Sequence, residues 1–178
     1  MNIIDFENIN VGYDEKIILK DITLKIKENE HWAILGANGS GKSTLMKLIQ
    51  SEIHPRKTNE YKKEILGKST YSIFELKKDL GIITNDLHNY FATHGNFLTG
   101  YITVLSGHYS SIGVFKHQDF TSEQHEKAKE TMKFLEIEHL KDKYVQEMST
   151  GELRKCIVAR ALIHDPKAFI LDEPTVGL

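Results

Sequence analysis

The sequence contains a single cysteine, Cys156, and this scarcity excludes a disulfide within the chain. A chain without disulfides is typical of a reducing compartment, so a cytoplasmic location is predicted. Cys156 lies in a helical apolar pattern, and we therefore expect a buried structural thiol rather than a reactive one.

Long hydrophobic runs are also missing. No stretch approaches the length of a membrane-spanning helix, and the N-terminus lacks a basic region followed by a long apolar segment. We therefore expect a protein that is soluble by itself and that needs a partner for any work at a membrane.

An excess of positive charge is absent as well. The formal net charge is −2, which argues against a protein that binds nucleic acid through a general basic field. A local basic run at residues 56–68 leaves a nucleic-acid patch open, but scattered lysines are more typical of a solvated face.

The strongest pattern that is present is a glycine-rich segment, residues 36–43, which fits GxxxxGKS. The apolar run at 31–35 predicts a strand before it, and the pattern at 43–49 predicts a half-buried helix after it. Small residues let several backbone N–H groups turn toward phosphate oxygens at the positive end of that helix. In such a loop Lys42 reaches the β- and γ-phosphates and the Ser43 hydroxyl binds Mg²⁺. The segment therefore predicts a nucleotide-binding phosphate loop.

The remainder of the chain alternates strand and helix patterns, and 178 residues suit one core, or one core with a small subdomain. The β-prone or apolar runs predict strands at residues 3–9, 17–26, 80–86 and 168–171. Capping boxes predict the start of two helices, at 121–135 and 149–162. The run that ends at Gly67 predicts an exposed hairpin or ribbon.

Two carboxylates follow the last predicted strand. Asp172 can hold the Mg²⁺ shell, directly or through water, and Glu173 can orient and deprotonate an attacking water. Gly151, in the first turn of the helix at 149–162, is costly for a helix unless something such as an anion approaches its backbone closely. Together with the phosphate loop, these features predict nucleotide hydrolysis.

The sequence resembles the ATP-binding domains of ABC (ATP-binding cassette) proteins. The segments GANGSGKST, MSTGE in the place of the usual LSGGQ, ARAL and FILDEPTVGL follow one another in the family's order. The resemblance covers essentially the whole chain and implies an α/β fold, with a P-loop NTPase (RecA-like) core, an antiparallel β subdomain and an α-helical signature subdomain. It implies one domain over 1–178, with the β part at 1–30, the core at 31–87 and 163–178, and the helical part at 88–162.

The resemblance also assigns roles to single residues. Lys42 and Glu173 match catalytic positions, and Ser43, Asp172 and Asn85 match positions that hold Mg²⁺. The positions that match ATP contacts are Tyr13, Gly36, Ala37, Asn38, Gly39, Ser40, Gly41, Lys42, Ser43, Thr44, Ser149 and Gly151. The Tyr13 ring would stack on adenine, although its position alone suits ordinary packing equally well.

Ser149 and Gly151 match residues that contact the γ-phosphate of an ATP bound mainly by the opposite subunit. The resemblance therefore implies two such domains packed head to tail, as a homodimer or as tandem copies. ATP would close the pair and hydrolysis would release it.

Two departures from the family pattern stand out. Asn85 replaces the usual Gln, and because its side chain is one methylene shorter, metal contact requires a closer loop or a bridging water. No histidine follows Glu173, so the family's switch histidine has no counterpart in this chain, which ends at Leu178. We therefore expect a fragment that binds ATP weakly and does not hydrolyse it at a normal rate.

Three functions are compatible with these patterns. The first is the ATPase subunit of an ABC transporter with a transmembrane partner at the inner face of the cell membrane, and a finer resemblance to molybdate-transport-type ATP-binding proteins agrees with it. The second is a soluble ABC ATPase that acts on ribosomes or DNA, and the third is a regulatory nucleotide-binding module. The absence of a coiled-coil insertion and of a basic balance favours the first over the second.

Overall fold

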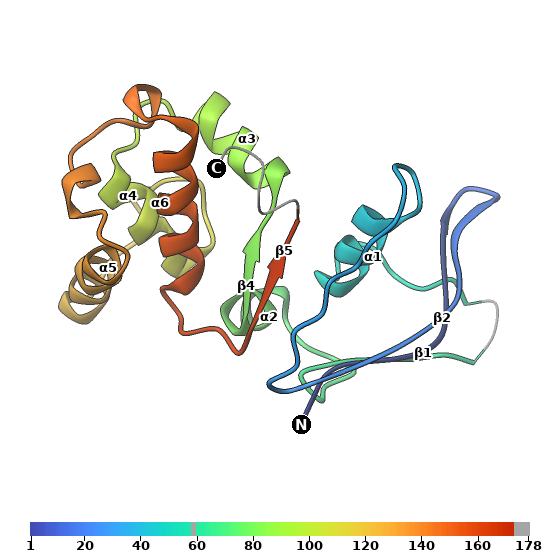
Figure 1. The fold of residues 1–178 in the computed structure, drawn as a ribbon. Helices are drawn as coiled ribbons and strands as arrows, with labels where there is room; N and C mark the ends of the chain where they lie inside the picture. Colours follow the sequence, from blue (N-terminus) through green and yellow to red (C-terminus); the bar gives the residue numbers. More distant parts are fainter. Residues whose placement is uncertain (58–59, 173–178) are drawn as a thin grey trace. The chain divides into compact units, whose positions relative to one another are not determined.

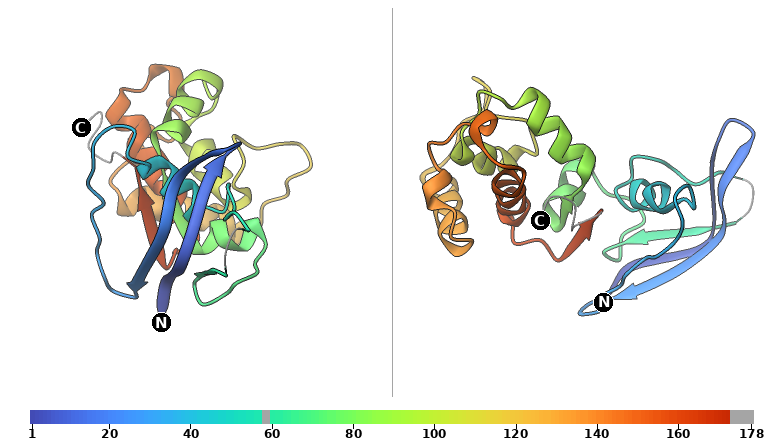
Figure 2. Two further views of the ribbon diagram at one scale, coloured as in Figure 1. Left: turned by 90° about the vertical axis from the view of Figure 1, so that its right-hand side faces the viewer. Right: turned by 45° about the horizontal axis from the view of Figure 1, so that its top comes forward.

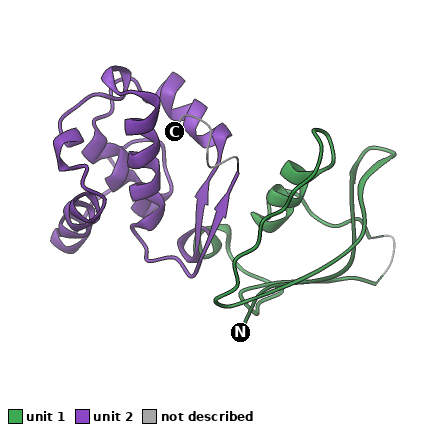
Figure 3. Ribbon diagram, viewed as in Figure 1, with its two compact units in different colours: residues 1–76 green, residues 77–178 purple. Residues whose placement is uncertain are grey.

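A computed structural model describes residues 1–57 and 60–172 of the chain. The chain divides into two units, residues 1–76 and residues 77–178 (Figure 3). The division falls inside the range 31–87, so the grouping of that range with 163–178 into one core stays a prediction.

A three-stranded antiparallel sheet forms the first unit. Strand β1 (Asn2–Tyr13) pairs with β2 (Lys16–Lys27) on one side and with β3 (Lys62–Ile65) on the other. Figure 2 shows β1 and β2 as a long hairpin, which confirms the strands predicted at 3–9 and 17–26. Apolar side chains of these strands are buried, and they include Ile4, Phe6, Ile9, Val11, Leu19 and Ile65.

Helix α1 (Lys42–Ile49) follows the glycine-rich loop and buries Leu48 and Ile49, as the apolar pattern predicted. At its C-terminus the Ser51 N–H donates to the Leu48 carbonyl at 3.1 Å, and the Glu52 N–H donates to the Lys47 carbonyl at 2.9 Å. Ser51 has a φ of 58°, the left-handed conformation in which such helix ends usually place glycine.

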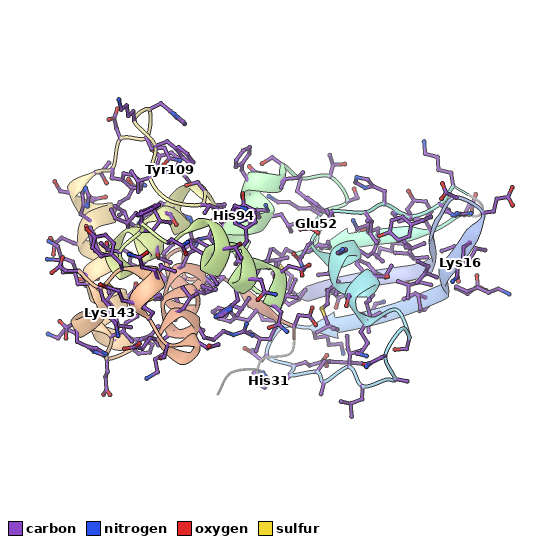
Figure 4. All side chains as sticks on the ribbon, turned by 90° about the horizontal axis from the view of Figure 1, so that it is seen from above. Lys16, His31, Glu52, His94, Tyr109 and Lys143 are labelled. Atoms are coloured by element: carbon purple, nitrogen blue, oxygen red, sulfur yellow. The ribbon has the colours of Figure 1, made fainter. Side chains whose placement is uncertain are left out.

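The strand predicted at residues 31–35 is wrong for this structure. The segment has no regular secondary structure, and Leu35 is 92% exposed. His31, labelled in Figure 4, lies on this irregular segment. A strand satisfies its backbone groups only through a neighbouring strand, and within the described part of the first unit the sheet consists of β2, β1 and β3.

The hairpin predicted to end at Gly67 is also corrected. Residues 62–65 form one strand, β3, whose partner is β1 rather than a second strand of the same segment. The turn after β3 is closed by a bridge between Ile65 and Lys68, and Gly67 takes a φ of 74°. β3 pairs with β1 in a register that places Ile65 opposite Ile4, and both side chains are buried.

The second unit is built on a two-stranded parallel sheet of β4 (Leu80–Ile83) and β5 (Ala168–Leu171), so both predicted strands are present. The strand predicted at 80–86 ends at Ile83, and the burial predicted for 168–171 is wrong at Phe169 and Leu171, which are exposed. Figure 1 shows the two strands side by side, with α6 on one side of them. The helices are α3 (Asn85–His94), α4 (Gly100–Leu105), α5 (Ser122–Phe134) and α6 (Thr150–Leu162), and α2 (Ile73–Asp79) runs across the boundary between the units. Short 3-10 turns are η1 (Ser106–Tyr109), η2 (Glu138–Leu140) and η3 (Val145–Glu147).

Helix α6 joins two apolar clusters in this unit. Cys156 and Ala159 pack in the cluster that α4 and α5 share, while Leu153 and Ile157 pack with Phe91 of α3 and Ile83 of β4. Cys156 is fully buried, and burial raises the pKa of its thiol to about 12, which confirms the expected structural thiol. None of the helices in the described residues is long and apolar enough to cross a membrane.

Replacing Ile157 with alanine should destabilise the second unit by about 2–5 kcal/mol, because the side chain is fully buried and the site cannot collapse completely. Urea unfolding monitored by circular dichroism measures the change. Lys155→Ala is the matched control, since Lys155 is exposed on the same helix and should change stability by less than about 0.5 kcal/mol. Equal effects of the two variants would contradict the assignment of this core.

Candidate functional site

The glycine-rich loop turns sharply into α1 within the first unit. Gly39 and Gly41 have φ values of 79° and 95°, a region that side chains other than hydrogen rarely adopt. A Cβ on Gly41 would lie 2.8 Å from Cδ2 of Leu19, and a Cβ on Gly36 would lie 2.6 Å from Oγ of Ser40. A Cβ at either position would therefore force a neighbouring side chain to move, and at Gly41 the backbone conformation also favours glycine.

The N-terminus of α1 carries no capping side chain. Gly41 occupies the N-cap position without a side-chain hydrogen bond, and the first turn contains no acidic residue. The first backbone N–H groups of the helix, those of Ser43 and Thr44 among them, therefore have no side-chain acceptor at the cap. They form the positive end of the helix dipole. This arrangement suits a bound anion.

Lys42 brings a positive charge to the same loop. Its Nζ donates to the carbonyl oxygens of Gly36 at 2.8 Å and Ala37 at 3.0 Å. Ala37, Asn38, Gly39 and Ser40 are exposed, so the ammonium and the loop backbone are accessible to a ligand. Residues 36–41 thus form the loop and residues 42–44 begin α1, and their contact with a phosphate chain stays a prediction.

Tyr13, the predicted adenine-stacking residue, lies at the end of β1 in the same unit. Its side chain is 49% exposed. Asp14 follows it with a φ of 49° and accepts a hydrogen bond through its carbonyl from the Arg56 guanidinium. The role in adenine binding stays a prediction.

In the second unit, parallel pairing places Asn85 and Asp172 at one end of the sheet. Ile83 is in register with Leu171, and the Asp172 N–H donates to the Ile83 carbonyl at 3.0 Å. The carboxyl ends of parallel strands therefore carry both predicted metal ligands. Glu173, the predicted catalytic base, lies outside the described residues.

Arg154 on α6 joins these two segments. Its Nη1 donates to Oδ1 of Asn85 at 3.2 Å and its Nη2 lies 3.4 Å from the Asp172 carbonyl oxygen. Arg154 is only 5% exposed, so its charge acts in a poorly solvated environment and holds the Asn85 amide in place.

Sequence reasoning missed Arg154, although a signal was present. Arg154 precedes Ile157 by three residues and Ala161 by seven, which puts it on the apolar face of the predicted helix. A charged residue on a buried face needs partners and is a candidate positioning residue.

The predicted signature residues lie at the start of α6. Ser149 is the N-cap, and its Oγ accepts from the Glu152 N–H at 3.2 Å. Glu152 in turn accepts from the Ser149 N–H at 2.7 Å and from Lys143 at 2.9 Å, which confirms the predicted capping box; Lys143 is labelled in Figure 4. Gly151 lies in the first turn and is half-buried, and its contact with a phosphate stays a prediction.

A family model for the ABC transporter family matches residues 19–176 of the chain. The sequence is 34% identical over 171 residues to an uncharacterized ABC transporter ATP-binding protein of Methanocaldococcus jannaschii, a match that covers 95% of this chain and 56% of that protein. Among solved structures it resembles cbiO1 of Clostridium perfringens, part of the ABC transporter complex cbiONQ. The TM-score is 0.77 at 30% identity, over 99% of this chain and 67% of that one.

The chain belongs to the ABC transporter family of ATP-binding domains. Its α/β fold is accordingly the P-loop NTPase fold of the ABC ATPases, as the sequence predicted. The ABC transporter ATP-binding protein ModF of Escherichia coli is also a relative, at 31% identity over 173 residues that cover 94% of this chain and 34% of ModF. This ABC domain thus spans little more than half the length of the first of these curated relatives, and a third of the second.

The signature helix of this ABC domain should lose stability in acid through Glu152. The hydrogen bond from Lys143, followed by that from the Ser149 backbone, lowers the pKa of Glu152 from 4.5 to about 2. Folding therefore favours the ionised carboxylate, so its stabilisation is complete above pH 4.5 and is lost as the pH falls toward 2.

Thermal unfolding of the wild type and of Glu152→Gln, measured between pH 2 and 7, tests this expectation. The wild type should have the higher melting temperature at neutral pH, and the difference should vanish toward pH 2. The control is Glu130→Gln, an exposed glutamate of α5. A difference that persists unchanged at the acid end would contradict the role of the ionised pair.

Proposed function

We propose that this chain is the ATP-binding and ATP-hydrolysing domain of an ABC transporter ATPase subunit. The observation that carries the proposal is the loop before α1, where a lysine, left-handed glycines and an uncapped helix N-terminus meet. The relatives' names, which describe ABC transporter ATP-binding proteins, support the same activity.

The residues present fit an ATP–Mg²⁺ complex. Residues 36–44 would bind the phosphates through their backbone N–H groups, and Lys42 would turn its Nζ from the loop carbonyls toward the β- and γ-phosphates. Tyr13 would hold the adenine by stacking. A bound Mg²⁺ supplies charge neutralisation on the phosphates.

Oxygen ligands for the metal are available on the proposed residues. The Ser43 hydroxyl, the Asp172 carboxylate and the Asn85 amide oxygen are of the type that Mg²⁺ prefers. Arg154 donates to Asn85 Oδ1 and so fixes the amide in position. Glu173 would accept a proton from the attacking water.

The signature suits a pair of domains. We place Ser149 and Gly151 against the γ-phosphate of an ATP held by a second ABC domain, either another copy or a tandem one. The capping box keeps the α6 N-terminus ordered for this contact. In this proposal residues 1–178 act as one ABC domain of the pair. ATP-driven closure of the pair would then move substrate through a transmembrane partner, from the cytoplasmic face of the membrane. No direct nucleic-acid contact is part of this function.

Lys42→Met should weaken ATP binding by about 10- to 100-fold, because a charged hydrogen-bond donor to phosphate contributes about 1.5–3 kcal/mol. Isothermal titration calorimetry with ATP and Mg²⁺ measures the change. Lys47→Met, on the same helix but in its last turn, is the matched control and should bind ATP like the wild type. Unchanged affinity in Lys42→Met would overturn the proposed site.

Hydrolysis and coupling need a separate measurement. Phosphate release by the full-length protein should depend on Glu173 and should be lost in Glu173→Gln while ATP binding remains. Turnover that increases on reconstitution with a membrane protein encoded beside this gene supports transport. Binding without turnover in any form would instead indicate a regulatory nucleotide-binding module.

A further inference from the structure

A pocket of about 550 Å³ lies in the first unit, away from the phosphate loop, and all its lining residues fall between Ser51 and Ile73. Ser51 and Lys63 line it together with the hydroxyl-bearing Ser69, Thr70 and Tyr71. The volume is in the range of small-molecule sites.

A chain of hydrogen bonds crosses this pocket. Lys63 Nζ donates to Oγ of Ser51 at 2.8 Å, and that Oγ lies 2.7 Å from the Tyr71 hydroxyl. An ammonium group has three donors, and Ser51 accepts only one of them. The Lys63 head group therefore has donor capacity left for a ligand.

Lys63 carries a charge that no carboxylate balances within residues 1–57 and 60–172 at ion-pair distance. It lies opposite the fully buried Phe6 in the β1–β3 register, so its stem is on the apolar face of the sheet. Its neighbour Lys62, in contrast, contacts Asp5 at 2.8 Å and Glu64 at 3.2 Å. The solvated face predicted for residues 56–68 is thus wrong at Lys63, whose pKa burial lowers from 10.5 to about 8.

Ser51 occupies a position that favours glycine. Its φ of 58° follows the end of α1, and a serine in this conformation costs on the order of 1 kcal/mol relative to glycine. The Ser51 side chain is buried, and its Oγ forms the hydrogen bonds with Lys63 and Tyr71.

We propose that this pocket binds a small oxyanion, a phosphate- or carboxylate-type group, between the Lys63 ammonium and the hydroxyl of Tyr71. The anion would supply a negative charge beside the Lys63 ammonium, which has no carboxylate partner within the described residues. Ser69 and Thr70 would offer further hydroxyl donors.

This pocket is separate from the proposed ATP site. Lys42 begins α1 and Ser51 follows its end, and eight helical residues span about 12 Å.

Binding should depend on pH through Lys63. The pocket is also lined by Lys62, Glu64, His54 and Tyr71, but Lys62 and Glu64 are already paired. The anion favours the charged ammonium, so it should raise the pKa of Lys63 back toward 10.5. From a free value of about 8, the affinity for sulfate, whose charge is constant over this range, should fall about tenfold between pH 7 and pH 9.

The test is a titration of the full chain, labelled with ¹³C at the lysine ε-carbons, with sodium sulfate and separately with sodium acetate. Lys63→Met assigns the Lys63 signal by its disappearance. We expect a saturable shift of this signal at millimolar anion, absent in sodium chloride of equal ionic strength and absent at Lys62. Saturation with sulfate alone identifies a phosphate-type site, and saturation with acetate alone a carboxylate-type site.

Two variants separate this proposal from the proposed function. Tyr71→Phe should weaken the sulfate response several-fold while the Lys63 signal remains observable. Lys42→Met should lose ATP binding and keep the Lys63 response unchanged. A Lys63 signal that does not saturate with either oxyanion, that responds equally to chloride, or that loses its response in Lys42→Met would overturn the proposal.

Discussion

The backbone at Gly41 has to turn through a left-handed conformation at the point where α1 begins, and the first unit depends on this turn. A Cβ at Gly41 would lie 2.8 Å from Cδ2 of Leu19 in β2, so a larger residue there would force Leu19 to move. The turn lets Lys42 fold back onto the loop carbonyls and leaves the first N–H groups of α1 without a side-chain cap. A loop of this kind is polar and exposed, so packing alone does not explain it, and its geometry agrees with the anion site proposed above.

The second unit rests on a different constraint, the parallel pairing of β4 and β5. Ile83 and Leu171, which are in register, are 88 residues apart in sequence, yet this register brings Asn85 and Asp172 to one end of the sheet. Arg154 is buried beside them and donates to both segments. Because breaking a buried charged hydrogen bond leaves an uncompensated group, this arginine makes the geometry of Asn85 and Asp172 interdependent.

Local patterns predicted the elements whose stability is local. The capping boxes at Thr121 and Ser149 formed as expected, since an N-cap and its partner are three residues apart and need no tertiary context. Alternating and clustered β-branched residues predicted β1 and β2, and these two strands find their partner locally because they follow each other in the chain and pair as a hairpin. The apolar run at 31–35 failed because a strand needs a neighbour, and periodicity contains no information about which strand that is. In the same way, the basic run at 56–68 indicated a solvated face, and β1 pairing placed Lys63 against the buried Phe6.

The sequence by itself determined the family and the glycine-rich loop before α1, because the motif that identifies them consists of consecutive residues whose spacing is set by one turn and one helix. The ligand contacts of those residues stay a prediction. Only the tertiary structure decided what Arg154 holds and where Lys63 places its charge. Both depend on contacts between residues distant in the chain. A charged side chain costs little free energy in water, and it needs a partner only when folding removes the water around it. A local sequence pattern does not show which side chains lose that water.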